Sequence, residues 1–314
     1  MAVLSIFLAV LLDRLFAEPR CYHPLAGFGR LATLLEQQLN CVSDPPWRQW
    51  AKGLLALLLL LLPPALLAGW LQAQLASSPW LLCLLSALLL YLTIGWQSLK
   101  QHAQAVFLPL QQGDLAAARA ALAMIVSRDT ASLDEQGIAV AATESVLENG
   151  ADALFSALFW FLLAGLPEVV VYRLCNTLDA MWGYRNARFA WFGKSSARLD
   201  DVLNWLPARL TALLYTLAGN SAQARHCWRQ QAARWKSPNA GVVMAAGAGA
   251  LGVSLGGAAC YHGQWQQRPL LGLALQAGSA ANRHSIVAAC RLLDRSLGIF
   301  LLLSVLLSLP WVLS

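Results

Sequence analysis

Long runs of apolar side chains without charge alternate with polar segments along this chain. Residues 53–99 contain no charged side chain, and within them 53–71 and 79–99 each approach the ~20 residues that a membrane-spanning helix needs. The break between them, 72–78, is polar but uncharged, as a short translocated loop should be. A third uncharged stretch covers 297–314. The pattern predicts a transmembrane hairpin at 53–99 and a C-terminal span.

The segments after the hairpin have helical spacing with recognisable boundaries. Residues 100–127 fit one helix that breaks at Gln112-Gly113-Asp114, where Asp114 is placed to cap a second helix. Ser132 and Glu135 have the spacing of a capping box, which predicts a helix from there to about Asn149.

Residues 153–175 are apolar but are interrupted by Gly165-Leu166-Pro167-Glu168. A single crossing would place the flanking polar halves on opposite faces of the membrane, so a re-entrant or helix–break–helix hairpin is favoured. Residues 176–296 then form a polar and basic region with a marginal apolar helix at 202–219. We find neither strand-period alternation nor a repeat. The expected fold class is therefore all-α: a polytopic integral membrane protein, one membrane-embedded domain over 1–314, with a helical polar region facing the cytoplasm.

The positive charges set the expected topology. Arginines and lysines precede the first long span and resume at Lys100, directly after the second span. By the positive-inside rule the hairpin leaves and re-enters the cytoplasm. The first twelve residues are apolar but lack a basic start and a small-residue cleavage site, so they do not indicate a signal peptide. We expect a multi-pass protein of the inner (cytoplasmic) membrane.

Charge is scarce but unevenly distributed. The chain is 58% hydrophobic and 12% charged, yet ten of its sixteen acids lie between Arg128 and Asn204. The stretch 202–293 contains no acid and eight cations, which favours anionic lipid headgroups or substrate phosphates as partners. No nucleic-acid-binding module is visible. The seven cysteines, Cys21 among them, have no paired spacing, which is typical of free thiols in a reducing compartment.

Two groups of oxygen ligands are candidates for Mg²⁺. Glu144, Glu148 and Asp152 are spaced four residues apart, so on a helix they share one face and repel unless a cation or arginines offset them. The second group is Asp200 and Asp201 with Asn204. Adjacent Asp200 and Asp201 should point apart, whereas Asp201 and Asn204 can face one ligand. Alternatively, Asp200 is simply a helix cap.

Other polar motifs flank these acids. Asn176 and Asp179 directly follow the apolar segment 153–175. Gly193-Lys194-Ser195 resembles the end of a phosphate-binding P-loop, but the upstream glycine is missing because position 188 is Arg. Ser237-Pro238-Asn239-Ala240-Gly241 is a turn that leads into a Gly/Ala-rich helix. Its exposed backbone N–H groups are able to bind an anion.

These motifs together resemble the ordered motif series of the CobD/CbiB family, and the resemblance covers nearly the whole chain. The matching segments are His23-Pro24, Arg128-Asp129-Thr130, Leu133-Asp134-Glu135, Glu144-Ser145-Val146, Glu148-Asn149, Asn176-Thr177-Leu178-Asp179, Gly183-Tyr184-Arg185, 197–209 (ARLDDVLNWLPAR) and 237–241 (SPNAG). Departures from the family pattern are Glu18 before Pro19, Gly150-Ala151 before Asp152, and Val242-Val243 after the SPNAG turn.

The resemblance implies an inner-membrane enzyme of vitamin B12 assembly. Such an enzyme joins (R)-1-amino-2-propanol, or its O-phosphate, to a propionate side chain of adenosylcobyric acid and consumes ATP. The expected partners are these substrates, membrane lipid and other membrane-associated cobalamin-assembly enzymes. A transporter, a lipid-alcohol phosphotransferase or a structural subunit are the competing classes. The chain lacks the phosphotransferase D-G-x-x-A-R motif and has too few long spans for a typical transporter.

Amide formation from a carboxylate requires activation, and ATP supplies it by forming an acyl phosphate. We expect Glu144, Glu148 and Asp201 to hold Mg²⁺ with the nucleotide, with Asp152 and Asp200 as alternatives. Asp179 or Asp129 would accept the proton of the attacking ammonium. Lys194 is a further catalytic candidate. Candidate groups for phosphate or substrate binding are Arg128, Arg185, Arg198, Arg209, Asn176 and Asn239.

Overall fold

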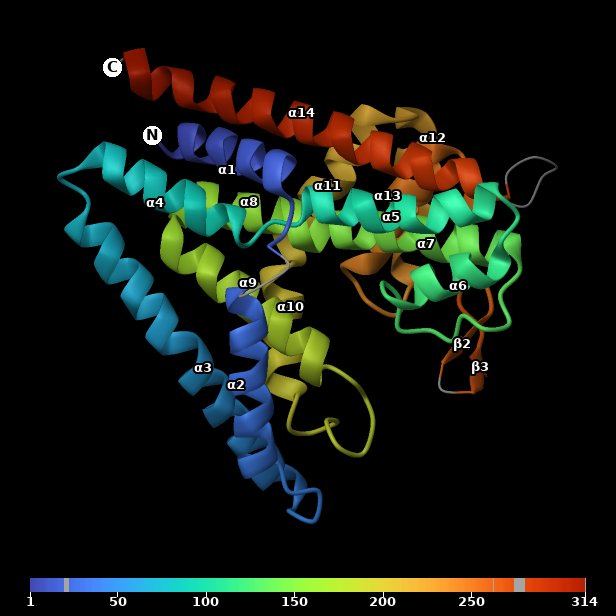
Figure 1. Cartoon of the computed structure of the whole chain (residues 1–314), viewed down its shortest axis with the longest axis horizontal. Helices are drawn as coiled ribbons and strands as arrows, with labels where there is room; N and C mark the ends of the chain where they lie inside the picture. Colours follow the sequence, from blue (N-terminus) through green and yellow to red (C-terminus); the bar gives the residue numbers. More distant parts are fainter. Residues whose placement is uncertain (20–22, 262, 274–279, 314) are drawn as a thin grey trace. The chain divides into compact units, whose positions relative to one another are not determined.

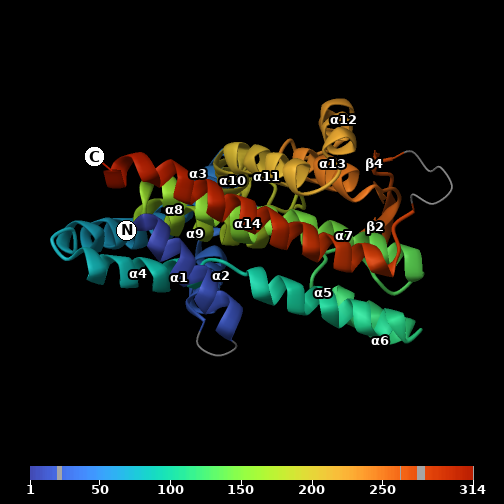
Figure 2. The ribbon, with the colours of Figure 1, turned by 90° about the horizontal axis from the view of Figure 1, so that it is seen from above.

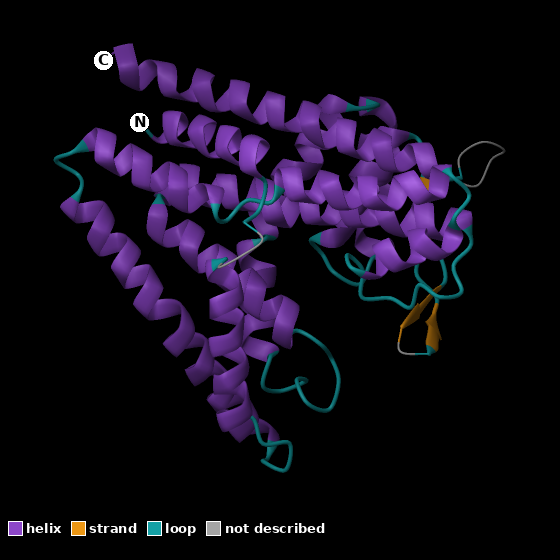
Figure 3. Ribbon diagram, viewed as in Figure 1, coloured by secondary structure: helices purple, strands orange, loops and turns teal. Residues whose placement is uncertain are grey.

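The computed structural model describes residues 1–19, 23–261, 263–273 and 280–313 and is mostly helical (Figures 1 and 3). The chain divides into two compact units. Unit 1 consists of Met1–Gly95 and Ser156–Asn204, and unit 2 consists of Trp96–Phe155 and Trp205–Ser314. Arg20, Cys21 and His262 lie outside the described residues. The single membrane-embedded domain expected from the sequence stays a prediction.

Unit 1 is built from seven helices within the described residues. They are α1 (Ala2–Phe16), α2 (Pro24–Leu39), α3 (Pro46–Gln74), α4 (Pro79–Tyr91), α8 (Ser156–Ala164), α9 (Leu166–Trp182) and α10 (Lys194–Leu203). Helix α9 packs against α3, α8 and α10, while α1 packs against α4. Helix α9 is therefore the central element of this unit, and it carries Asn176 and Asp179.

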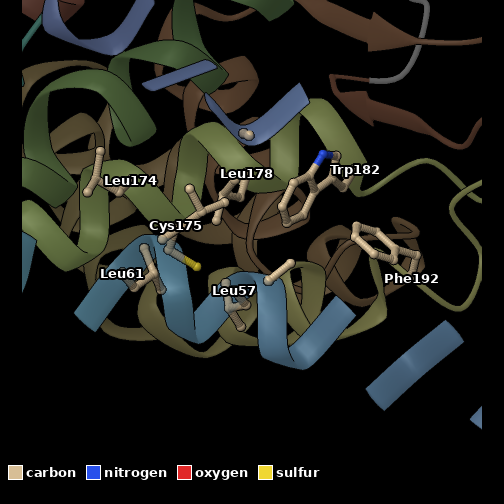
Figure 4. Close-up of a cluster of buried hydrophobic side chains, with 10 residues drawn as sticks. Leu57, Leu61, Leu174, Cys175, Leu178, Trp182 and Phe192 are labelled. Carbon is tan, nitrogen blue, oxygen red and sulfur yellow. The ribbon is translucent and has the colours of Figure 1, made fainter. Parts of the chain in front are cut away.

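Large apolar side chains from α3 and α9 interlock in the core of unit 1 (Figure 4). Trp182 meets Phe192 edge-on, with 5.1 Å between ring centroids. Gly53 of α3 lies against the backbone of Phe192, where an added Cβ would come within 2.0 Å of the carbonyl oxygen. This close approach positions the segment before α10, and with it the acids of α10.

The chain breaks between α8 and α9 at Gly165. Its φ of 92° lies in the left-handed region that glycine adopts without strain. The Leu166 N–H then donates to the Gln72 Oε1 at 2.8 Å, which ties the start of α9 to the end of α3. The predicted helix–break–helix geometry of 153–175 is therefore present locally. Re-entry without crossing stays a prediction.

Unit 2 contains the remaining described elements. They are α5 (Trp96–Gln111), α6 (Leu115–Ala123), α7 (Glu135–Gly150), η1 (Ala151–Phe155), α11 (Trp205–Ala218), α12 (Ser221–Gln231), η2 (Ala232–Arg234), α13 (Ala240–Leu251), β1 (Ser254–Gly256), β2 (Ala259–Tyr261), β3 (Gln264–Gln266), β4 (Leu270–Gly272) and α14 (Arg283–Leu313). Helix α7 packs against α5, α13 and α14 (Figure 2). The Gly/Ala-rich α13 packs closely, as expected, because Gly247 faces Leu147 and Gly249 faces the backbone of Ala224.

Two short antiparallel ladders interrupt the helical pattern of unit 2, which the sequence did not predict. Strand β1 pairs with β4, with Leu255 opposite Leu271, and β2 pairs with β3, with Cys260 opposite Trp265. Each strand has three residues, so its alternation is too short to be read from the sequence. The fold class remains all-α, with these strands as an arm between α13 and α14.

Helix α7 passes into a π-helical turn, η1, at Ala151–Phe155. A Cβ at Gly150 would lie 2.7 Å from a Leu293 side-chain atom and 2.8 Å from the Tyr215 hydroxyl, so glycine permits close packing here. The Tyr215 hydroxyl donates to the Leu147 carbonyl oxygen at 2.9 Å. Small residues before Asp152 are thus explained by packing.

In the part of the chain that the structure describes, four helical stretches are long and apolar enough to cross a membrane: Pro46–Gln74, Pro79–Gln111, Glu135–Ala164 and Arg283–Leu309. The chain is therefore a polytopic membrane protein by length and composition, as predicted. The stretch Glu135–Ala164 is longer than the sequence predicted. The apolar segment was expected to begin near residue 153, but α7, η1 and α8 form one continuous helical stretch that begins at Glu135.

The helix caps confirm one prediction and correct another. The Asp114 carboxylate accepts from the Ala117 N–H at 2.9 Å and caps α6, as expected. Helix α7 is capped by Asp134, which accepts from the Gly137 N–H at 2.7 Å, so the predicted Ser132 cap is wrong by two residues. The six described cysteines are free, as predicted.

Candidate functional site

Glu144 is the centre of a buried ion cluster in unit 2. Its side chain is 3% exposed and forms an ion pair with Arg128. Arg268 donates to both carboxylate oxygens at 3.1 Å, and the Gly256 N–H donates to Oε1 at 2.7 Å. Among the described residues, the donors to Glu144 are guanidinium groups and a backbone N–H. A metal ion at Glu144 would therefore compete with these donors and with the charges of both arginines.

Arg268 connects three elements of unit 2. Its Nε donates to the Gly257 carbonyl oxygen at 3.1 Å, and its guanidinium lies 5.3 Å from the centre of the Trp235 ring. Together with the Glu144 pairs, these contacts fix the β1–β4 arm to α7. The sequence indicated Arg268 only as part of the basic region. Because residues 202–293 contain no acid, an arginine in this stretch can pair only with an acid from another part of the chain. That was the signal available in the sequence.

Glu148 lies on the Glu144 side of α7, as the spacing predicted, whereas Asp152 lies beyond it in the π-helical turn. The Glu148 side chain is exposed and interacts with the charge of Glu144 and with those of Arg128 and Arg268. Asp152 lies in the π-helical turn, half-buried, where it raises the pKa of Tyr215 beyond the effect of burial. The π-turn begins after Glu148 and changes the helical phase there, so only Asp152 departs from the expected four-residue alignment.

Asp129 fixes the β2–β3 hairpin to the loop before α7. Its Oδ2 accepts from the Gly263 N–H at 2.8 Å and from the Cys260 thiol at 3.2 Å. Its own N–H donates to the Cys260 carbonyl oxygen at 2.8 Å. The carboxylate raises the pKa of that thiol. These contacts favour a positioning role for Asp129 over the predicted proton-accepting role, which stays a prediction.

Three carboxylates lie together in unit 1, on α9 and α10. Burial raises the pKa of Asp179 to about 7, and the nearby charges of Asp200 and Asp201 contribute to that rise. Burial also raises the pKa of Asp200 and of Asp201, although Arg185 opposes the shift at Asp201. The sequence indicated Asp200 and Asp201 as a pair, and the structure adds Asp179 to them.

Amide groups hold Asp200 in place. Asn176 donates to its Oδ1 at 3.2 Å, and Asn204 donates to its Oδ2 at 3.0 Å. The Asn204 Oδ1 in turn accepts from the Ser156 and Tyr172 hydroxyls at 2.9 and 3.0 Å. The Asn204 amide therefore orients Asp200, and the expectation that Asp201 and Asn204 face one ligand stays a prediction. The cap interpretation of Asp200 is wrong, since Asp200 lies inside α10, which begins after Gly193.

The predicted cations of unit 1 lie close to the acids of α9 and α10 along the sequence, and their side chains are exposed or partly exposed. Arg185 is exposed in the loop before α10 and acts on the charge of Asp201. Lys194, at the start of α10, lies 4.4 Å from the centre of the Trp191 ring. Arg198 is exposed on α10. These side chains are accessible to a charged ligand.

Arg209 and Asn239, predicted separately, are brought together in unit 2. The Arg209 Nη1 donates to the Asn239 Oδ1 at 3.2 Å and to the Trp205 carbonyl oxygen at 2.7 Å. Its guanidinium also stacks 4.2 Å from the Trp205 ring centre, and burial lowers its pKa. In the SPNAG turn the Ser237 Oγ accepts from the Asn239 and Ala240 N–H groups, which occupies donors expected to bind an anion.

The predicted Mg²⁺ ligands are divided between the two units. Glu144, Glu148 and Asp152 belong to unit 2, while Asp200 and Asp201 belong to unit 1. Within the described ranges, no group of three or more His, Cys, Asp or Glu side chains is arranged to hold a metal ion. Mg²⁺ often takes only one or two carboxylates together with substrate phosphates and water. The exposed Asp201 beside Asp200 fits that mode, whereas the arginine-paired Glu144 does not.

Comparisons with known proteins match nearly the whole chain. The family described as "CobD/Cbib protein" matches residues 6–293. "Cobalamin biosynthesis protein CobD" of Chromobacterium violaceum is 53% identical over 95% of this chain and 94% of its own length. The proteins of the same name from Stutzerimonas stutzeri and Mycobacterium tuberculosis (strain H37Rv) are 54% and 39% identical, over 95% and 85% of each chain. No solved structure matches.

Proposed function

Because the chain belongs to the CobD/CbiB family, we propose that it is an ATP-dependent acid–amine ligase of cobalamin biosynthesis. It joins (R)-1-amino-2-propanol, or its O-phosphate, to a propionate side chain of adenosylcobyric acid and forms adenosylcobinamide or its phosphate. It works as a multi-pass protein of the inner membrane, with its polar site facing the cytoplasm. Other membrane-associated cobalamin-assembly enzymes would supply and consume its corrinoids.

The chemistry has two balanced steps. A propionate oxygen of the corrinoid attacks the γ-phosphorus of ATP, which gives an acyl phosphate and ADP. The amine is protonated at neutral pH, so a base of the site first takes one proton from the ammonium. The free amine nitrogen then attacks the acyl carbon, inorganic phosphate leaves with the electron pair of the C–O bond, and the second proton lost by the nitrogen passes to that phosphate.

The acid cluster of unit 1 is the observation that carries this proposal. Asp179 has a pKa raised to about 7 by burial, Asp200 and Asp201. A general base is most effective when its pKa lies near the working pH, and surface aspartates are far too acidic for that role. Asp179 would therefore take the proton of the ammonium, while the cluster attracts the cation to the site. A purely structural role would not require carboxylates whose like charges act on one another.

Phosphate groups need cations that are not already neutralised. Arg185, Lys194 and Arg198 border the acid cluster in the sequence and are at least partly exposed, so they are the best candidates in unit 1. Arg209 with Asn239 is the candidate in unit 2. Arg128, predicted as a phosphate ligand, is paired with Glu144 and would instead hold the β1–β4 arm.

Mg²⁺ would enter with the nucleotide, because Asp201 and Asp200 offer the one or two carboxylates that a nucleotide-bound ion uses. When bound, the ion would neutralise charge on the transferring phosphoryl group. Asn176 and Asn204 orient Asp200 through its two oxygens. They would keep Asp200 in position whether or not the ion is present.

The test uses the full-length protein purified in detergent with adenosylcobyric acid, aminopropanol phosphate and MgATP. We expect ADP to form only when both other substrates are present, in a 1:1 ratio to amide product. Asp179→Asn should lower the rate, whereas Glu135→Gln, an exposed acid on α7, should not. Amide formed without ATP would refute the acyl-phosphate route. ADP formed without a corrinoid would refute the ligase assignment.

A further inference from the structure

Helix α11 of unit 2 carries a stripe of exposed leucines along one face. Leu206, Leu213 and Leu217 are 50%, 46% and 52% exposed, and Leu210 between them is partly exposed. Steps of three and four residues place all four on the same side of a helix. The buried side of α11 packs within unit 2 against α13, η1 and α14, which contains a candidate membrane span. Lipid hydrocarbon is therefore the natural cover for this leucine stripe.

Helix α12 begins four residues after Leu217, and its charged side chains are all basic. Arg225 and Arg229, one turn apart, are both exposed, and so are Arg234 and Lys236 directly after the helix. Within the described part of the chain, none of these four cations forms an ion pair. Their charge is thus available to an anion from outside the protein.

Close packing holds α12 in a fixed position in unit 2. Ala224 and Cys227 are fully buried, and an added Cβ at Gly249 of α13 would lie 2.8 Å from the Ala224 Cα. The Asn220 side chain caps α12 by accepting from the Gln223 N–H at 3.2 Å. In Figure 2, α12 runs across α14 and not along it. A basic helix that runs across a span has the orientation of one that lies along the membrane surface.

The depth of α12 follows from the contrast with α11. Arginine is strongly unfavourable in the hydrocarbon core of a bilayer, so Arg225 and Arg229 lie outside it. The chain from Leu217 to Ser221 reaches at most about 14 Å, so α12 cannot be far from the hydrocarbon that covers the leucine stripe. The headgroup layer lies between these two limits.

We propose that the exposed basic face of α12, formed by Arg225 and Arg229, binds the phosphate of an anionic phospholipid such as phosphatidylglycerol. Guanidinium groups donate paired hydrogen bonds to phosphate oxygens. A net negative headgroup is attracted more strongly than the zwitterionic phosphatidylethanolamine, and Arg234 and Lys236 add to the local charge. The nearby leucine stripe of α11 favours a lipid over a soluble phosphate. None of these cations takes part in the proposed ligase chemistry, so the lipid site does not depend on it.

The test is native mass spectrometry of the full-length protein in detergent, titrated with phosphatidylglycerol or phosphatidylethanolamine of matched acyl chains. We expect phosphatidylglycerol to bind more tightly, and its affinity to fall as salt is raised. Arg225→Gln and Arg229→Gln should each weaken phosphatidylglycerol binding about fivefold, and the double variant about 25-fold. Phosphatidylethanolamine binding should stay near the wild-type level. Equal binding of the two lipids to the wild type would overturn the proposal.

Two further double variants separate this face from general electrostatic attraction. Arg225→Lys/Arg229→Lys keeps both charges and should retain the preference for phosphatidylglycerol. Arg14→Gln/Arg30→Gln removes two exposed arginines of unit 1 and should leave the tightest phosphatidylglycerol site unchanged. If this pair weakens binding as much as the α12 pair, net charge alone attracts the lipid and the proposal is wrong. Displacement of phosphatidylglycerol by an equal concentration of inorganic phosphate would also overturn it, because the face would then serve a soluble anion.

Discussion

The buried carboxylates of the two units have different kinds of neighbours. In unit 2 Glu144 is neutralised by Arg128 and Arg268, whose side chains are 10% and 14% exposed. In unit 1 Asp179, Asp200 and Asp201 lie near one another, and amide groups donate hydrogen bonds to Asp200. An acid held by arginines stays charged and fixes structure. Acids that repel one another stay close to protonation and are suited to proton transfer.

Glu144→Ala should have the largest effect on stability. It leaves two mostly buried arginines without their carboxylate, which costs about 3 kcal/mol or more of unfolding free energy. The β1–β4 arm should become accessible to protease at the same time. Thermal unfolding in detergent, followed by tryptophan fluorescence, measures the first effect. Glu148→Ala, one turn along α7 and exposed, should change stability by less than about 0.5 kcal/mol; equal losses in the two variants would contradict the assignment.

Asp179→Asn should reverse this pattern, with a large loss of activity and little loss of stability. Replacing a general base lowers the rate by about 100-fold or more. The fold should be as stable as the wild type or more so, because a like charge is removed beside Asp200 and Asp201. Ligase turnover and thermal unfolding measure the two effects. Wild-type turnover in Asp179→Asn would exclude it as the base.

The raised pKa of Asp179 also predicts opposite pH trends for activity and stability. Its pKa rises from an ordinary value of 3.8 to about 7, so the folded state binds the proton more tightly than the unfolded state does. Stability from this group is therefore present at low pH and is lost as pH rises from about 4 to about 7. Activity should increase through pH 7, as the base loses its proton. Asp179→Asn should flatten the stability trend, and an unchanged trend would assign it to other groups.

Asn176→Ala should give the smallest effect. Its hydrogen bond lowers the pKa of Asp200, so its removal should raise that pKa and shift the acidic limb of the activity profile upward by less than about one pH unit. Turnover at high pH should stay near the wild-type value, because Asp200 is ionised there in both proteins. Thr177→Ala, at the neighbouring position, is the control. A uniform loss at every pH would indicate that Asn176 contacts substrate directly.

Local sequence patterns predicted most of the helices, because capping and apolar runs act over a few residues. The Asp114 cap, the break at Gly165 and the helix after Ser237 follow from side chains near the boundary itself. Asp134 caps α7 in place of the predicted Ser132, because the helix begins at Glu135. Three-residue strands lie below the length at which periodicity can be detected.

The sequence predicted which residues belong to the candidate site, but not which of them pair with one another. The sequence identified Glu144, Arg128, Asp179 and Asp200 as candidates, because acids and arginines are rare in such an apolar chain. It could not show that Glu144 pairs with Arg268, which lies 124 positions away. Such pairings depend on how α7 packs under the β1–β4 arm, and that packing is decided by apolar contacts far from the charges.

The sequence by itself determined that this is a helical, multi-span membrane protein of the CobD/CbiB family with a scarce and clustered set of charges. Hydrophobic run length and short motifs are local properties, so they can be recognised without knowledge of the fold. Only the tertiary structure decided which carboxylates are neutralised and which are held near protonation. That distinction depends on burial and on the distance to the nearest opposite charge, and both are set by segments that are remote in sequence.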